Sequence, residues 1–178
     1  MSIMSKLLGQ CRKPMGWLGR AAAWGINRGH SEVIDWGLGH TLIGEDDKIL
    51  DVGCGGGETV HKLARIAEEG HVYGIDFSKA SVAVSRRRNR QLMQAGRIHI
   101  QRGSVCCLPF SDGGFDLVTA VETHYFWPDL VSDLQEIRRV LKLGGKLPVI
   151  GEAYEWGWLC GIGTRPLQSG DGPGSKSG

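Results

Sequence analysis

Glycines cluster in the segment Asp51-Val-Gly-Cys-Gly-Gly-Gly57, between an apolar run that begins at Lys48 and a predicted helix over residues 58–69. Glycine lets the backbone turn sharply and approach a ligand closely. An acidic residue, Asp76, ends the next predicted strand, one strand-helix unit later. In a sheet of parallel strands both features lie at the carboxyl edge, where ligands bind. The spacing therefore predicts a nucleotide-type binding site.

The glycine spacing distinguishes this site from a dinucleotide site. A dinucleotide fingerprint is G-x-G-x-x-G, and counting from Gly53 and Gly55 its third glycine position holds Glu58. A carboxylate at a helix N-terminus repels the pyrophosphate that backbone N–H groups bind there. The sequence also lacks G-x-x-x-x-G-K-[ST]. The pattern favours a ligand without phosphate over the cofactor of an NAD-dependent oxidoreductase, and the remaining alternative is a plain tight turn.

Three segments resemble the class I, Rossmann-like methyltransferases that use S-adenosylmethionine (SAM): residues 49–57, Asp76, and FDLVTAVE at 115–122. They occur in the order typical of that family, and the resemblance extends over residues 45–151. It implies an α/β fold with a doubly wound, mostly parallel sheet and flanking helices. It also implies SAM as the cofactor and methyl transfer to an unidentified small-molecule acceptor by in-line displacement.

The resemblance implies a set of cofactor-binding residues. The glycine loop would hold the methionine part of SAM, with Asp51 orienting that loop or the amino group. Asp76 would accept hydrogen bonds from the ribose hydroxyls or cap a helix, and Phe77 would pack on the adenine or in the core. The family typically recognises adenine with an acidic residue, where this chain has Ser104. The implied set is Asp51, Gly53, Gly55, Gly57, Asp76, Phe77, Ser104, Val105 and Val121.

Residues 121–128 follow the fourth predicted strand, and in the resembling family this stretch lies beside the transferred methyl group. The side chains that would contact the acceptor, or instead anchor the next helix, are His124, Tyr125 and Trp127. The catalytic residue is not identified, and the candidates for a general base are His124, Glu122 and His30. An N-terminal helical segment shapes the acceptor pocket in the family, so candidates for its wall are Trp24, Asn27, His30 and Trp36.

Strands and helices alternate along the sequence, which predicts a parallel sheet. Strands are expected over residues 48–52, 71–76, 97–105, 115–122 and 146–151. Ser78 is expected to cap a helix that runs to Gly96. A further helix is expected to start at Pro128 and to end at Gly144-Gly145. Its apolar face is predicted to contain Leu130, Leu134, Ile137 and Leu141.

The chain divides into three predicted parts: an N-terminal helical cap over residues 1–45, the SAM-binding core over 46–158, and a tail over 159–178. The tail is rich in glycine, serine and proline, so it is expected to be disordered or non-native. The final strands of the resembling fold are missing, which would leave the strand with Pro148 as an edge. The alternative function is a catalytically inactive or truncated SAM-binding module.

The composition sets the remaining expectations. The 178 residues carry 21 Lys and Arg against 19 Asp and Glu, a formal net charge of +2, which argues against a nucleic-acid partner. The run RRRNR at 86–90 is interpreted as a solvated helix face, with an RNA contact as the alternative. Five cysteines without a C-x-x-C pair indicate reduced thiols and a cytoplasmic protein. The sequence predicts no membrane segment and no metal site, and it leaves the oligomeric state open.

Overall fold

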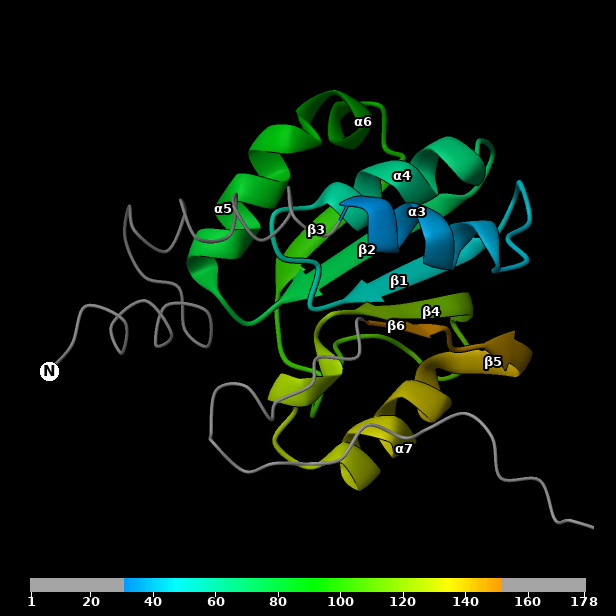
Figure 1. Cartoon of the computed structure of the whole chain (residues 1–178), viewed down its shortest axis with the longest axis vertical. Helices are drawn as coiled ribbons and strands as arrows, with labels where there is room; N and C mark the ends of the chain where they lie inside the picture. Colours follow the sequence, from blue (N-terminus) through cyan, green and yellow to red (C-terminus); the bar gives the residue numbers. More distant parts are fainter. Residues whose placement is uncertain (1–30, 152–178) are drawn as a thin grey trace, which may run out of the picture.

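The computed structural model describes residues 31–151. A parallel sheet runs through the middle, with helices on both of its faces (Figure 1). Its strands are β1 (Lys48–Val52), β2 (His71–Asp76), β3 (Ile98–Arg102), β4 (Phe115–Val121), β5 (Leu141–Lys146) and β6 (Val149–Ile150). The strand order is β3-β2-β1-β4-β5, with β6 also paired to β4, and these pairs are parallel. The predicted α/β fold with a doubly wound sheet is confirmed.

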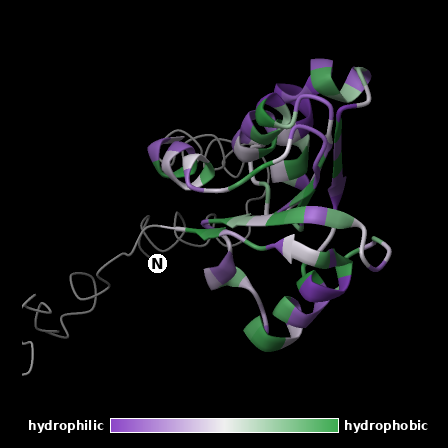
Figure 2. Ribbon diagram, turned by 90° about the vertical axis from the view of Figure 1, so that its right-hand side faces the viewer, coloured by the Kyte–Doolittle hydropathy of each residue, from purple (hydrophilic) through white to green (hydrophobic). Residues whose placement is uncertain are grey.

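Helices cover the sheet unequally. They are α3 (Ser31–Gly39), α4 (Glu58–Ile66), α5 (Lys79–Arg88), α6 (Arg90–Gln94) and α7 (Leu130–Val140), and a 3-10 turn, η1 (His124–Phe126), precedes α7. The first four helices lie on one face and α7 lies on the other (Figures 1 and 2). Within residues 31–151, no helix has both the length and the apolar character needed to cross a membrane.

Successive side chains of the central strands point to opposite faces of the sheet, and each face has its own hydrophobic core. Ile49 belongs to the core that contains Leu63 of α4, whereas the next residue, Leu50, belongs to the core that contains Ile137 of α7. All four side chains are completely buried. Burial on both faces is typical of parallel strands. The two cores fix the central strands, and with them the carboxyl ends at which the predicted site lies.

The helix after β2 begins as predicted and ends earlier than predicted. Ser78 is the N-cap of α5, and its hydroxyl oxygen accepts a hydrogen bond from the Ser81 backbone N–H at 3.3 Å. α5 ends at Arg88 with Asn89 as its C-cap, and α6 follows from Arg90 to Gln94, so the helix that the sequence predicted as far as Gly96 is interrupted at Asn89. The Asn89 side-chain amide donates to the Gly57 carbonyl oxygen, and side chains that bind the backbone in this way favour helix ends. This contact is remote in sequence, so local pattern did not reveal it.

The helix predicted to end at the glycine pair is shorter than predicted. α7 ends before Leu141, which begins β5. Leu130 and Leu134 are exposed, whereas Asp133 and Ile137 on the neighbouring side of the helix are buried. The predicted end of α7 is therefore wrong. Its predicted apolar face is correct at Ile137 and wrong at Leu130 and Leu134.

The fifth predicted strand is present but interrupted. Lys146 lies opposite Leu117 of β4, and Ile150 lies opposite Val121, so the same register continues across the break. Pro148 lies between β5 and β6, where its lack of a backbone N–H removes a donor to β4. Within residues 31–151, β5 is the last strand on this side of the sheet.

Candidate functional site

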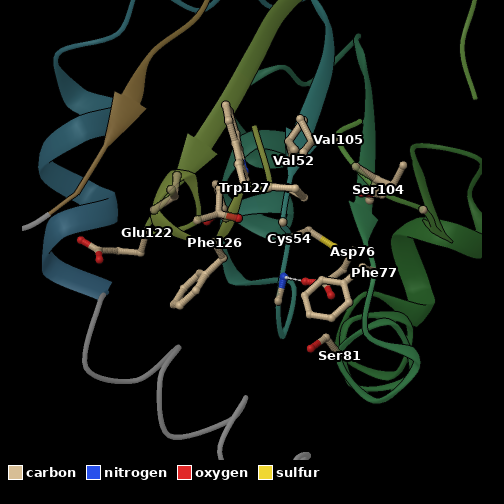
Figure 3. A pocket seen from close by; sticks show the side chains of 18 of the residues that line it. Val52, Cys54, Asp76, Phe77, Ser81, Ser104, Val105, Glu122, Phe126 and Trp127 are labelled. Atoms are coloured by element: carbon tan, nitrogen blue, oxygen red, sulfur yellow. Dashed lines mark hydrogen bonds between the residues drawn. The ribbon is translucent and has the colours of Figure 1, made fainter. Parts of the chain in front are cut away.

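A pocket of about 360 Å³ lies at the carboxyl ends of β1, β2 and β4 (Figure 3). The strand order reverses between β1 and β4, which is where doubly wound sheets bind ligands, and its volume is typical of small-molecule sites. Among the predicted cofactor-binding residues and general-base candidates within residues 31–151, those that do not line the pocket are Asp51, Gly57 and His124. Those that line it are Gly53, Gly55, Asp76, Phe77, Ser104, Val105, Val121 and Glu122.

The backbone of the glycine loop requires glycine at three positions. Gly53, Gly55 and Gly57 have φ angles of 76°, 50° and 81°, in the left-handed region that a Cβ disfavours. The N–H groups of Gly53 and Cys54 donate to the Ile75 carbonyl oxygen at 2.8 and 3.0 Å, which fixes the loop to the end of β2. The G-x-G-x-G spacing therefore follows from the turn between β1 and α4.

The variant Gly53→Ala is expected to destabilise the fold. A Cβ at this position would collide with the Thr123 side chain, which also lines the pocket. Gly96→Ala is the matched control, because Gly96 has a φ of 75° and open space around it. Both variants should lose about 1–2 kcal/mol from backbone strain, and the collision should add about 1–3 kcal/mol for Gly53→Ala alone. Urea denaturation measures both losses, and equal values would contradict the predicted collision.

Asn89 joins the glycine loop to α5 from a buried position. Its side-chain amide donates to the carbonyl oxygens of Gly57 and Ser85 at 3.0 Å each, and its Oδ1 lies 3.1 Å from Nδ1 of His61. The side chain supplies donors to two carbonyl groups that lie on different elements. The glycine loop is thus held by α5 as well as by β2.

The variant Asn89→Ala is expected to lower the free energy of unfolding by about 2–3 kcal/mol, because it removes donors from buried carbonyl groups. Gln91→Ala is the control, since Gln91 is exposed two residues further on, and its effect should stay within about 0.5 kcal/mol. Thermal unfolding of the two variants gives the comparison. A loss no larger in Asn89→Ala than in the control would show that this side chain does not hold the loop.

Asp76 connects the glycine loop to the start of α5. Its Oδ2 accepts from the Gly55 N–H at 2.9 Å, and its Oδ1 accepts from the Ser78 N–H at 2.7 Å. Burial raises the pKa of Asp76, and these two donors partly offset the rise. The cap of α5 is Ser78, so Asp76 is not the N-cap. Its carboxylate lines the pocket and keeps lone pairs for further donors.

Asp51 lies deeper than Asp76, with only 2% of its surface exposed. The Thr119 hydroxyl donates to its Oδ1 at 2.6 Å. Burial raises the pKa of Asp51 to about 7; the Thr119 hydrogen bond opposes the rise and the charge of Asp76 adds to it. Within residues 31–151, no Lys or Arg forms an ion pair with either carboxylate. Nearby positive charge stabilises buried carboxylates, so the site favours a cationic ligand.

One end of the pocket combines an aromatic ring with a hydroxyl group. Phe77 is 42% exposed, so the alternative in which it packs in the core is wrong. The Ser104 hydroxyl oxygen accepts from the Cys106 thiol at 3.2 Å, and the Val105 side chain belongs to the core beneath. Phe77 and Ser104 lie on the same side of the pocket as Asp76 (Figure 3). This end suits a flat ring that carries polar edge groups.

The other end is formed by residues that follow β4. Trp127 lines the pocket and also packs against the core on the α7 face. Phe126, which the sequence did not single out, lines the pocket too. His124 and Tyr125 do not line it, and their rings pack against each other with centroids 3.8 Å apart. The 3-10 turn therefore separates the aromatic residues into a pocket wall and a second pair beside it.

Glu122 has an unusual backbone at the end of β4. It is the non-glycine residue with a positive φ, 51°, within residues 31–151. Its N–H donates to the Ile150 carbonyl oxygen at 2.8 Å, which holds the turn against β6. Its carboxylate is directed away from Asp76 and Phe77 (Figure 3). Glu122 therefore belongs to the β4 end of the pocket.

Of the four candidates for the N-terminal wall, Trp36 lies in the described part of the chain. His30, Trp24 and Asn27 lie outside residues 31–151. Trp36 is 66% exposed and does not line the pocket, to which α3 contributes Ile34. Other lining residues that the sequence analysis missed are Cys54, Thr59, Ile75, Ser81, Gly103, Thr123 and Pro128. Thr59 and Ser81 lie in the first turns of α4 and α5, directly after predicted site motifs, which was a usable signal.

The arginine run is partly structural. Arg86 donates to the Ile100 carbonyl oxygen at 2.9 and 2.7 Å. Arg88 pairs with Glu58, and Lys62 lies 3.8 Å from the other carboxylate oxygen of Glu58. Glu58 is the first residue of α4, at the position where a dinucleotide site needs glycine. Two arginines of the run thus hold α5 to its neighbours.

Residues 49–145, more than half of the chain, match the model of a family described as a methyltransferase domain. The chain belongs to the class I SAM-dependent methyltransferases. The predicted family, fold and cofactor class are therefore confirmed.

Named relatives share about a third of the matched residues. The 2-phytyl-1,4-naphtoquinone methyltransferase of Synechococcus elongatus is 37% identical over 105 residues, which cover 58% of this chain and 45% of that protein. The demethylmenaquinone methyltransferase of Lactiplantibacillus plantarum is 34% identical over 119 residues, covering 61% and 50%. Among solved structures, the complex of the Haloferax volcanii Trm112 methyltransferase activator with a methyltransferase has a TM-score of 0.66 at 27% identity, covering 71% and 54%. The chain thus spans about half the length of these proteins.

Proposed function

We propose that this chain binds SAM in the pocket and transfers its methyl group to a small aromatic acceptor of the quinone type. The observation that carries the proposal is the pair of buried carboxylates at the glycine loop, Asp51 and Asp76, which have no Lys or Arg partner within residues 31–151. SAM brings an ammonium and a sulfonium group and carries no phosphate. A pyrophosphate ligand would instead be repelled by both carboxylates.

The proposed roles of the cofactor-binding residues follow the order of the pocket wall. Gly53 and Gly55 hold the methionine part, and the Asp76 carboxylate accepts hydrogen bonds from the ribose hydroxyls. Adenine lies on Phe77, with its polar edge toward Ser104 and the Val105 backbone. Asp51 and Gly57 lie outside the wall, so their proposed role is to support the loop and, for Asp51, to attract the ammonium group by its charge.

The acceptor is proposed to lie at the β4 end. Val121, Phe126 and Trp127 give this end an apolar, largely aromatic wall, which suits a flat apolar ring. The names of the two relatives, a 2-phytyl-1,4-naphtoquinone and a demethylmenaquinone methyltransferase, support a quinone-type ring for this chain.

The residues of the chain contribute orientation and exclusion of water. When bound, SAM supplies a methyl group activated by a positive sulfur. The glycine loop and Asp76 fix the donor end, and the aromatic wall fixes the plane of the acceptor. Holding two reactants in line contributes up to about 7–11 kcal/mol to lowering a barrier. The apolar wall also keeps water away from the reacting centre, which favours a step that disperses charge.

A second candidate function is SAM binding without methyl transfer. One observation favours it: among the candidate bases, Glu122 is directed away from Asp76 and His124 does not line the pocket. The cofactor end of the site is therefore more complete than the acceptor end in the described part of the chain. This candidate predicts cofactor binding with no product from any acceptor.

A turnover assay separates the two candidates. The full chain is mixed with SAM and a 1,4-dihydroxynaphthalene, and both S-adenosylhomocysteine (SAH) and methylated acceptor are quantified by mass spectrometry. The proposed function predicts equal amounts of the two products, lost in Asp76→Ala. SAH that binds the folded chain without turnover on a panel of phenolic acceptors would support the second candidate. A folded chain that shows neither binding nor turnover would exclude both.

A further inference from the structure

The β4 end of the pocket contains a group of acid-base side chains that no step of the proposed function uses. Around Gly151, just after β6, three side chains converge: a Cβ built on Gly151 would lie 3.3 Å from Oε1 of Glu122, 3.4 Å from Cε1 of His124, and closest of all to the Tyr125 hydroxyl oxygen. All three atoms therefore surround one point. Glu122 lines the pocket, whereas His124 and Tyr125 do not.

Two further features mark this cluster. Glu122 adopts a positive φ of 51°, a conformation that side chains other than glycine, Asn and Asp rarely adopt, and such outliers gather at functional sites. His124 Nδ1 is buried and has no hydrogen-bond partner in the described structure. Buried polar atoms are normally paired, so an orphan atom indicates a missing ligand or water.

We infer that Glu122 accepts a proton from the acceptor, positioned by His124 and Tyr125, and that the acceptor is a phenol or hydroquinone with an ionisable O–H. This inference rests on the proposed function and assigns the reacting group of the acceptor. Glu122 is assigned as the catalytic residue because it is the member of the cluster that lines the pocket, and the other two are positioning residues.

The proposed step balances as follows. The acceptor O–H bond breaks and its proton passes to a carboxylate oxygen of Glu122. The electron pair left on the acceptor, on oxygen or on the ring carbon conjugated to it, forms the new bond to the methyl carbon as the carbon–sulfur bond breaks. The sulfonium becomes a neutral thioether, and the proton later leaves Glu122 for water. No oxidant or further reactant is needed.

The test compares Glu122→Gln with the unmodified chain on two acceptors. One is a weakly acidic phenol, protonated at the assay pH, and the other is a nitrophenol that is already ionised. General-base catalysis is worth about 100- to 10,000-fold, so turnover of the weakly acidic phenol should fall by at least about 100-fold. Turnover of the ionised acceptor should fall much less, and SAH affinity measured by calorimetry should stay the same. Glu68→Gln, on an exposed glutamate, is the control.

A second variant gives a readout that does not depend on activity. Glu122→Gly removes the carboxylate and relieves the positive φ, so it should raise the unfolding temperature while it abolishes turnover of the protonated phenol. A merely structural glutamate would give a lower unfolding temperature and an equal loss on both acceptors, and that result would overturn the inference. Unchanged turnover in Glu122→Gln would overturn it as well. An unmodified chain that binds no SAH would instead refute the proposed function itself.

Discussion

Replacing Asp76 by alanine is expected to weaken SAM binding by about 100- to 20,000-fold while the chain stays folded. The carboxylate lines the pocket and is held in place by the N–H groups of Gly55 and Ser78. Each hydrogen bond to a charged group contributes about 1.5–3 kcal/mol, and each 1.4 kcal/mol is a factor of ten in affinity. Two ribose hydroxyls bound to Asp76 therefore account for the predicted loss.

The variant Asp76→Asn separates binding from stability. Burial raises the pKa of Asp76, which means that its ionised form destabilises the folded state at neutral pH. The amide removes the cost of the buried charge but offers one acceptor oxygen to the two backbone N–H groups, so the unfolding temperature should change little while SAH binding still weakens. Calorimetry and thermal unfolding on the same samples measure both, with the exposed Asp46→Asn as the control. If the loss of SAH affinity only followed the loss of unfolding temperature, a direct contact between Asp76 and the cofactor would be contradicted.

The second large effect is a dependence of SAM affinity on pH below neutrality. The pKa of Asp51 is about 7 in the ligand-free chain because the side chain is buried. A cationic ligand favours the ionised carboxylate, so below pH 7 binding must first remove a proton. The apparent Kd should then rise up to tenfold for each pH unit, which is about thirty-fold at pH 5.5. Calorimetry from pH 5.5 to pH 8 measures the profile and the proton released on binding.

Asp51→Asn is the matched control for this profile. The amide has no charge to titrate, so its affinity should be weak at pH 8 and nearly independent of pH. The Asp51 carboxyl also affects the stability of the fold, but there the protonated form is the favourable one. Because the pKa of Asp51 in the folded chain lies above the ordinary aspartate value of 3.8, the contribution of Asp51 to stability is most favourable below pH 3.8 and is lost as the pH rises to about 7. Asp51→Asn should therefore gain stability over the unmodified chain at pH 8 but not at low pH. A pH profile of affinity shared by both proteins would rule out Asp51 as the titrating group.

The elements that the sequence predicted best are those defined by local pattern. The strand at residues 48–52, the strand at 71–76 and the Ser78 cap are where the sequence places them. Their signals lie within a few residues: apolar runs, the glycine turn and a capping serine. The end of α5 depends on Asn89 reaching Gly57, and the start of β5 depends on pairing with β4. Neither partner is visible in the neighbouring sequence.

The same distinction applies to the candidate site. The backbone of the glycine loop and Asp76 were predictable because turn geometry and strand ends are local features. The sequence did not predict which side chains after β4 line the pocket. The 3-10 turn places His124 and Tyr125 near Gly151, whereas Phe126 and Trp127 line the pocket. Residue type alone favoured His124, Tyr125 and Trp127 equally and did not single out Phe126. Only the three-dimensional course of the turn distinguishes them.

The measurement that tests the account most directly is calorimetric titration of the full chain with SAH and, separately, with NAD. We expect one SAH site per chain, strongly weakened in Asp76→Ala, and no binding of NAD, because the two buried carboxylates repel its pyrophosphate. A folded chain that binds NAD as tightly as SAH, or binds neither, would contradict the account.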